Sequence, residues 1–297
     1  MRFKDNEFIP YKYHDGRVLA HLDPRSKSIF INCTFGLSIF WEYCCIFNQF
    51  NLINFNISLP EDYLIEMRSL KYYRLMKEVL IEQIDGFSNV FFLDKLPYDC
   101  ISPIDLLNLC QSIYSDFFPN LICSPKEIFY PNCKEYPLTL PDKYIVINTK
   151  MILNSEIIYW EKNKQILKDI IKSAKIPIVL IGEKQPMECK EYEIHGSPSI
   201  YKELLLSFDD VIDLTLETTE DLYHTGIMHR NMNILNNSLF NIHFGGGGGR
   251  IVFAFLNHTI SLSSDTPSIS QIFWLSKYEN VQTTDSKVFS DYLKKFL

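Results

Sequence analysis

The sequence predicts an α/β fold made of two doubly wound parallel sheets that face each other across a cleft. Strand-like and helix-like segments alternate in both halves of the 297-residue chain, as they do in parallel βαβ units. The segment IPIVLI (176–181) is nearly all apolar, as a strand buried on both faces of a parallel sheet must be. Between these halves, 120–142 carries four prolines and no period, which is typical of a linker. We therefore expect an N-terminal domain over 1–140, a C-terminal domain over 141–275 and a helical tail over 276–297.

The sequence of the first half predicts three strands, each followed by a helical segment. Apolar residues indicate strands over 28–33, 55–59 and 89–93. Helices are expected over 37–50 and 61–84, the second on the strength of its 3.6-residue apolar period. A third helix is expected from Ser102 and Pro103 to about Phe118, because serine is a good N-cap and proline suits the first helical position.

The second half repeats the alternation. Strands are expected over 143–148, 176–181, 210–214, 239–244 and 259–262. Helices are expected over 156–174, 219–237, 250–256 and 286–297.

Composition and charge exclude several classes of protein. With 29 Lys and Arg against 36 Asp and Glu, the chain has no global basic field, so nucleic acid is not an expected partner. The first 17 residues lack the pattern of a signal peptide, and no apolar stretch approaches the roughly 20 residues of a membrane helix. The eight cysteines are scattered and form no C-x-x-C pair. We expect a cytoplasmic protein with buried, reduced thiols and no transmembrane segment.

Five of the 11 glycines stand together at 245–249, between a predicted strand and a predicted helix. A glycine turn there can point several backbone N–H groups into one concavity that favours a phosphate or diphosphate. The next residue, Arg250, is placed to add a charge-assisted contact. The alternative is a turn that binds nothing. The run matches neither G-x-G-x-x-G nor a Walker A motif. An ordinary dinucleotide-binding site and a P-loop NTPase are therefore excluded.

The segment from about Asp142 to Asp265 resembles the nucleotide-sugar-binding domain of GT-B glycosyltransferases, most closely the heptosyltransferase-like group of glycosyltransferase family 9. The resemblance rests on the order of four segments, namely YIVINTK (144–150), IPIVLIGEK (176–184), ETTEDL (217–222) and NNSLFNIHFGGGGGRIVFAFLNHTISL (236–262). It implies two Rossmann-like domains of GT-B type, with the acceptor on the N-terminal domain and the nucleotide sugar on the C-terminal one. It also implies that the last helix crosses back onto the N-terminal domain.

The resemblance assigns donor-binding residues. It places Lys150 on the donor diphosphate, together with the turn residues and the arginine that follows them. These are Gly245, Gly246, Gly247, Gly248, Gly249 and Arg250. It places the residues after the second strand, Gly182, Glu183 and Lys184, beside the nucleoside. It places Glu217, Thr218 and Thr219 at the ribose or base. Alternatively, Lys150 and Lys184 are solvated surface lysines, and Thr218 and Thr219 cap a helix.

An inverting transfer needs a base for the acceptor hydroxyl and positive groups for the leaving diphosphate. Asp94, directly after the predicted strand 89–93, is our first candidate for the base, and Glu42 is the second. Alternatively, Asp94 is a structural residue of a turn and Glu42 forms a salt bridge. Helix dipoles and lysine can supply the positive charge, and no D-x-D stands where a metal site is expected, so we expect no metal and no cofactor. His224 and His229 are five apart, which is not the spacing of helical metal ligands.

The sequence thus predicts a metal-independent, inverting glycosyltransferase that moves a sugar from a nucleotide-diphosphate sugar to a hydroxyl of a glycan, a lipid-linked acceptor or a protein. Two alternatives stay open. One is a nucleotide-sugar epimerase or hydrolase on the same fold. The other is a catalytically inactive binding module that presents its acidic surface to a partner protein.

Overall fold

The computed structural model describes residues 9–12, 18–23, 28–33, 46, 54–58, 89–92, 100–117, 137–149, 154–182, 184, 197–217, 225–244, 257–262 and 278–297. The chain divides into two units, Met1–Asn132 and Cys133–Leu297. The expected helices over 37–50, 61–84 and 250–256 lie outside the described residues, apart from the helical Ile46.

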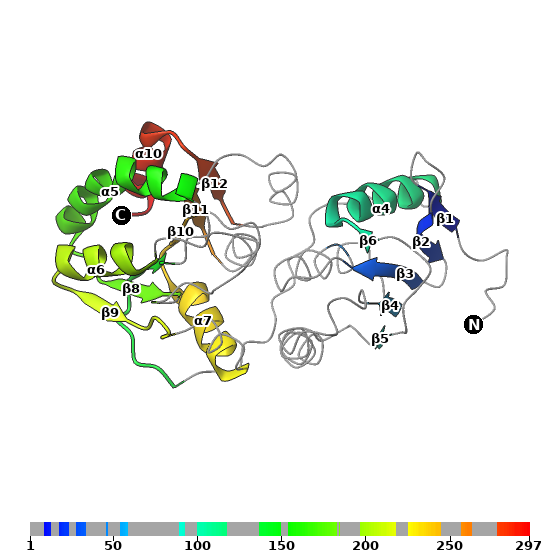
Figure 1. Ribbon diagram of the computed structural model, residues 1–297, viewed down its shortest axis with the longest axis horizontal. Coiled ribbons are helices and arrows are strands. Elements are labelled where there is room, and N and C mark those ends of the chain that lie inside the picture. The colour runs from blue at the N-terminus through cyan, green and yellow to red at the C-terminus, as the bar shows by residue number, and fades with distance from the viewer. Residues whose placement is uncertain are drawn as a thin grey trace. The chain divides into compact units, whose positions relative to one another are not determined.

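The first unit holds a six-stranded sheet and one described helix (Figure 1). Its strands are β1 (Ile9–Lys12), β2 (Val18–Asp23), β3 (Ser28–Cys33), β4 (Asn54–Ser58), β5 (Asn89–Phe92) and β6 (Cys100–Ile101). The order is β1-β2-β3-β4-β5, and β6 pairs with β3. The predicted strands over 28–33, 55–59 and 89–93 are confirmed as β3, β4 and β5.

The sheet of the first unit is mixed, so the expectation of a wholly parallel sheet there is wrong. β1 pairs with β2, and β2 with β3, in antiparallel fashion, whereas β3, β4, β5 and β6 pair in parallel. Antiparallel neighbours need no crossover helix between them. The strand and helix alternation that revealed the parallel strands therefore carries no signal for β1 and β2.

Helix α4 (Pro103–Phe117) begins where its N-terminal signals place it. The Ser102 Oγ accepts a hydrogen bond from the Asp105 backbone N–H at 3.2 Å and donates to the Asp105 carboxylate at 2.6 Å. This reciprocal cap satisfies one of the first N–H groups of the helix. Its apolar stripe, which includes Leu106 and Cys110, is fully buried.

The second unit is a six-stranded sheet in which every pairing is parallel. Its strands are β7 (Ile145–Asn148), β8 (Ile178–Ile181), β9 (Val211–Asp213), β10 (Asn241–Phe244), β11 (Thr259–Leu262) and β12 (Asn280–Thr283). Its described helices are α5 (Asn154–Ala174), α6 (Ser197–Ser207), α7 (Thr225–Asn237) and α10 (Ser286–Phe296). The predicted second-half strands and the helices at α5, α7 and α10 are confirmed, whereas α6 and β12 were not predicted.

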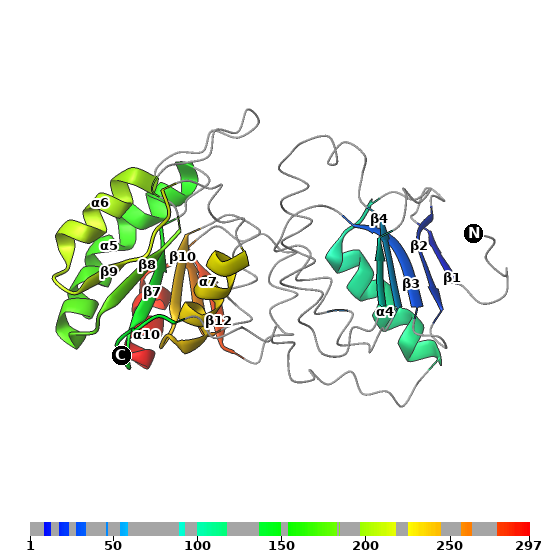
Figure 2. The same cartoon turned by 90° about the horizontal axis from the view of Figure 1, so that it is seen from below.

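One face of this sheet is apolar. Ile147, Ile242 and Ile260 lie on it at 0–1% exposure, in register across β7, β10 and β11. They join a core that also contains Trp160 of α5 and Phe289 of α10. Figure 2 shows α5, α6 and α10 on this side of the sheet and α7 on the other.

The last helix packs within its own unit. Asp285 caps its N-terminus by accepting a hydrogen bond from the Lys287 backbone N–H at 2.7 Å. Phe289, Tyr292 and Leu293 of α10 are buried in the core of the second sheet. The apolar stripe of α10 is therefore occupied by the second unit, and the expected crossing of this helix onto the first half stays a prediction. Among the described helices, none combines the length and hydropathy needed to cross a membrane.

Candidate functional site at the carboxyl edge of the second sheet

The strand order of the second unit reverses between β7 and β10. From the central β7 the chain adds β8 and β9 on one side, then crosses over to add β10, β11 and β12 on the other. In open parallel sheets, ligands bind beyond the carboxyl ends of the strands at such a reversal. The carboxyl ends of β7 and β10 meet there, with His243 in register with Asn148. We call this the switch point.

The carboxyl ends of β7 and β8 are joined by Thr149. Its backbone N–H donates to the Ile181 carbonyl at 2.9 Å, and its hydroxyl donates to the same oxygen at 3.2 Å. Thr149 is fully buried and Asn148 is 7% exposed. The backbone geometry immediately before Lys150 is thus fixed by the sheet, although Lys150 itself lies outside the described residues.

The predicted site residue Gly182 has a backbone role. Its φ of 109° is one that other residues rarely adopt. Its carbonyl accepts a hydrogen bond from the Leu216 N–H at 2.8 Å, and the Lys184 N–H donates to the Leu216 carbonyl at 2.8 Å. Glycine here lets the segment after β8 stay bonded to the segment after β9, and this brings Lys184 beside Glu217.

Lys184 lies between two carboxylates. Its Nζ is 2.5 Å from Oε1 of Glu217, 4.0 Å from Oδ2 of Asp213 and 5.6 Å from the centre of the Tyr201 ring. The hydrogen bond to Glu217 is the largest influence on the pKa of Lys184 and holds it above its ordinary value. Two predicted nucleoside-binding residues, 33 positions apart, are therefore brought together by the pairing of β8 with β9.

Asp213, the last residue of β9, accepts three hydrogen bonds. They come from the Tyr201 hydroxyl at 2.5 Å, the Thr215 hydroxyl at 2.6 Å and the Thr215 N–H at 3.0 Å. Burial favours the neutral acid, but these bonds and Lys184 outweigh it, so the pKa of Asp213 lies below its ordinary value. The hydrogen bond from the Tyr201 hydroxyl to Asp213 is also the largest influence on the pKa of Tyr201 and raises it above its ordinary value. We call Lys184, Tyr201, Asp213, Thr215 and Glu217 the β8–β9 cluster.

The β8–β9 cluster carries two carboxylates against one ammonium. A phosphate, with its own negative charge, is poorly matched to that excess of negative charge. Sugar hydroxyls are a better match, because an ionised carboxylate can accept hydrogen bonds through either of its two oxygens. This end of the carboxyl edge is therefore suited to a polyhydroxylated group.

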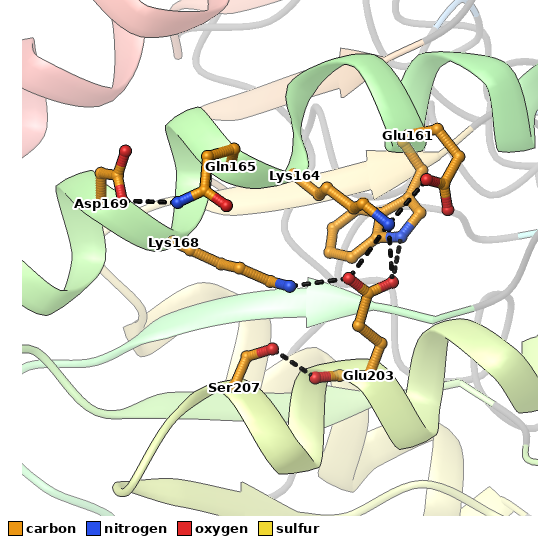
Figure 3. Close-up of polar contacts among 8 residues, drawn as sticks. Glu161, Lys164, Gln165, Lys168, Asp169, Glu203 and Ser207 are labelled. Carbon is orange, nitrogen blue, oxygen red and sulfur yellow. Dashed lines mark hydrogen bonds and ion pairs between the residues drawn. The ribbon is translucent and has the colours of Figure 1, made fainter.

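An aromatic contact holds the end of β10 against α5 at the switch point. Phe244, the last residue of β10, meets Trp160 of α5 edge to face, with ring centres 5.2 Å apart. The Trp160 Nε1–H donates to Glu203 of α6 at 3.2 Å. Figure 3 shows that the Glu203 carboxylate also binds the ammonium groups of Lys164 and Lys168, at 3.2 and 2.6 Å. Glu203 thus ties α6 to α5 at the residue that packs against the end of β10.

The other predicted site residues lie outside the described part of the chain. They are Glu42, Asp94, Lys150, Glu183, Thr218, Thr219, Gly245, Gly246, Gly247, Gly248, Gly249 and Arg250. Their assigned roles stay predictions. No group of three His, Cys, Asp or Glu side chains able to hold a metal ion occurs in the described residues.

Three members of the β8–β9 cluster, Tyr201, Asp213 and Thr215, were missed from the sequence. Asp213 carried a usable signal, because it ends a short apolar strand in a parallel sheet, where site residues concentrate. Tyr201 carried none, because it belongs to α6, a helix that the sequence pattern did not reveal.

No protein-family model matches the chain, and a comparison with curated proteins likewise finds no match. Two solved structures similar to it are of the dodecameric, iron-containing glycosyltransferase TibC, the first a heptosyltransferase complex with ADP-D-beta-D-heptose and the second from enterotoxigenic E. coli. The first is 10% identical with a TM-score of 0.47, and covers 88% of this chain and 64% of TibC. The second is 10% identical with a TM-score of 0.40, and covers 85% and 57%. The chain therefore spans less than two thirds of the length of these TibC chains.

Proposed function

We propose that the second unit binds a nucleoside-diphosphate sugar at its carboxyl edge and that the protein transfers the sugar to a hydroxyl acceptor. The observation that carries the nucleotide site is the all-parallel strand order with its reversal between β7 and β10, which is the arrangement that binds nucleotides in open α/β sheets. The transfer reaction is supported by the resemblance of segments 144–150, 176–184, 217–222 and 236–262 to GT-B glycosyltransferases. A glycan, a lipid-linked sugar or a protein would serve as the acceptor.

The charges along the carboxyl edge support one orientation of the donor. Among the described residues, the ends of β7 and β10 carry Asn148 and His243 and no carboxylate, whereas the β8–β9 cluster carries Asp213 and Glu217. We therefore propose that the diphosphate lies over β7 and β10, and that the ribose lies over β8 and β9. In this arrangement Lys150, the glycine run 245–249 and Arg250 would hold the diphosphate.

The proposed reaction is a single displacement. The acceptor oxygen attacks the anomeric carbon and forms the new glycosidic bond, while the bond from that carbon to the diphosphate oxygen breaks and its electron pair leaves with the nucleoside diphosphate. Asp94, or Glu42 as second choice, takes the proton from the acceptor hydroxyl. Lys150, Arg250 and backbone N–H groups stabilise the charge that develops on the diphosphate, so the scheme needs no metal.

A thermal-shift panel of UDP, GDP, ADP, CDP and CMP, with and without magnesium, tests the nucleotide site, because a ligand that binds only the folded state raises its apparent stability. We expect one diphosphate to raise the melting temperature without magnesium. Gly247→Val should abolish that shift while the protein stays folded. The matched control is Gly226→Val on α7, where an added Cβ has no atom within 4 Å apart from its chain neighbours and the backbone of its own helix. Unchanged affinity in Gly247→Val would rule out the glycine run as the diphosphate site.

Product analysis separates transfer from the alternatives. With the cognate nucleotide sugar, a transferase releases nucleoside diphosphate in proportion to the acceptor added. Epimerised or hydrolysed sugar without any acceptor would replace the transferase proposal with an epimerase or hydrolase. Binding without turnover, together with a protein that co-purifies in stoichiometric amount, would support the inactive binding module.

The ribose position is tested with a 2′-deoxy ligand. If Glu217 accepts a ribose hydroxyl, the wild type should bind the ribonucleoside diphosphate about tenfold more tightly than its 2′-deoxy form, the effect of roughly one charge-assisted hydrogen bond. Glu217→Gln should reduce that preference. Equal affinities of the wild type for both ligands would show that the ribose does not bind at Glu217.

A further inference from the structure

A row of polar side chains crosses the face of the second sheet that carries α7. Asn148 of β7, His243 of β10 and Ser261 of β11 are in register on neighbouring strands. Parallel strands in register point these side chains to the same face. Asn148 is 7% exposed, His243 is 3% and Ser261 is 1%. We call these three residues the polar row.

The polar row departs from what a parallel sheet requires. Such sheets are buried on both faces and their strands are normally apolar throughout. The opposite face follows that rule with Ile147, Ile242 and Ile260, one residue earlier on the same three strands. Departures from local rules of this kind concentrate at functional sites.

The polar residues nearer the amino ends of the same strands have a different role. Asn241 accepts a hydrogen bond from the Ser238 hydroxyl at 2.8 Å, and the Thr259 hydroxyl donates to the Asn257 carbonyl at 3.0 Å. These bonds close the turns that lead into β10 and β11. Thr259 lies on the same face, away from the carboxyl edge, and therefore serves as a matched control.

We propose that the polar row is the floor of the ligand site at the switch point and that His243 is its positioning residue. His243 occupies the middle strand of the three, between Asn148 and Ser261, at the rung next to the carboxyl edge. All three side chains can donate hydrogen bonds and none is a carboxylate, so the floor suits the oxygens of a diphosphate. This inference rests on the proposed function, because it assumes that a nucleoside diphosphate occupies the switch point.

The test compares affinities for UDP, GDP, ADP and CDP by titration calorimetry well below the melting temperature. His243→Leu should weaken the diphosphate that binds wild type by tenfold or more, while Thr259→Val leaves its affinity within twofold. If His243 served only to stabilise the fold, His243→Leu would lower the melting temperature, as Thr259→Val does, and its affinity for the diphosphate would equal that of wild type. His243→Gln keeps a hydrogen-bonding group at the position and should restore the affinity to within about threefold of wild type.

Ser261→Ala removes only one oxygen and serves where His243→Leu does not fold. It should weaken the same ligand about threefold. Equal effects of the His243 and Thr259 variants, or unchanged affinity in both His243→Leu and Ser261→Ala, would overturn the floor while leaving the nucleotide site intact. A wild-type protein that binds none of the four diphosphates would overturn the proposed function and, with it, this inference.

Discussion

Replacement of Glu203 tests how the switch point is held in place. The Glu203 carboxylate of α6 accepts hydrogen bonds from Lys168 at 2.6 Å and from Trp160 at 3.2 Å, and pairs with Lys164. Trp160 is fully buried and packs on Phe244 at the end of β10. Glu203→Gln keeps an acceptor for the indole N–H and removes the charge, whereas Glu203→Leu removes both.

The two variants should differ in the free energy of unfolding. Glu203 and its lysines are partly exposed, at 28% for Glu203 and 16% for Lys168, so each ion pair contributes at most about 1 kcal/mol. Glu203→Gln should therefore destabilise the protein by about 1 kcal/mol. Glu203→Leu also leaves the buried indole N–H without an acceptor, which costs a further 1–3 kcal/mol, roughly.

Urea denaturation followed by tryptophan fluorescence measures both differences. Equal destabilisation by the two variants would refute the reasoning, because it would mean that the indole N–H does not depend on Glu203. The pH dependence gives a second check. Burial raises the pKa of Glu203, but its hydrogen bonds from Lys168, Trp160 and Lys164 together lower it below the ordinary value. Its contribution is therefore complete above the unfolded-state pKa of about 4.3 and disappears as the pH falls through the lower folded-state value, a loss that Glu203→Gln should not show.

Three further predictions concern single positions in the second unit. Gly182→Ala should destabilise it by about 1–2 kcal/mol, because alanine is strained at a φ of 109°; urea titration with no change in midpoint would contradict this. Burial raises the pKa of Tyr144 to about 12, so wild type should lose stability relative to Tyr144→Phe as the pH rises from about 10 through that value; parallel alkaline unfolding curves would argue otherwise. Asn163 is fully buried and, among the described residues, its Oδ1 has no hydrogen-bond partner, so Asn163→Leu should stabilise the protein by about 1 kcal/mol; a lower melting temperature would show that the amide is needed.

The fold of the second unit could be predicted from the sequence because its strands are buried on both faces. Segments 143–148 and 176–181 stand out because they are short and mostly apolar, and the structure places β7 and β8 there. β12 (NVQT) has a single apolar residue and lies at the edge of the sheet, where one side of the strand needs no partner. Its polar composition therefore hid it.

The candidate site could be predicted only where it depends on residues close to a strand end. Gly182 and Lys184 come just after β8 in the sequence. Their position at the carboxyl edge of the sheet, where ligands bind, could therefore be inferred from the order of the elements. The polar row could not, because it depends on register: Asn148, His243 and Ser261 lie on strands far apart in the sequence and align only after β7, β10 and β11 pair. The mixed sheet of the first unit was missed for the related reason that antiparallel pairing leaves no helix between strands.

Photo-labelling with the azido analogue of the diphosphate that binds most tightly tests the central claim, the position of the nucleotide site, most directly. Tandem mass spectrometry of the digested protein locates each label to a residue, which is needed because Ser238 and His243 share the segment between Arg230 and Arg250. We predict labels at or next to Asn148, Lys184 or His243, at the carboxyl edge of the second sheet, and loss of labelling with excess unmodified nucleotide. Competable labels confined to the amino edge, at or next to Ser238 or His258, or to the first unit would contradict the account.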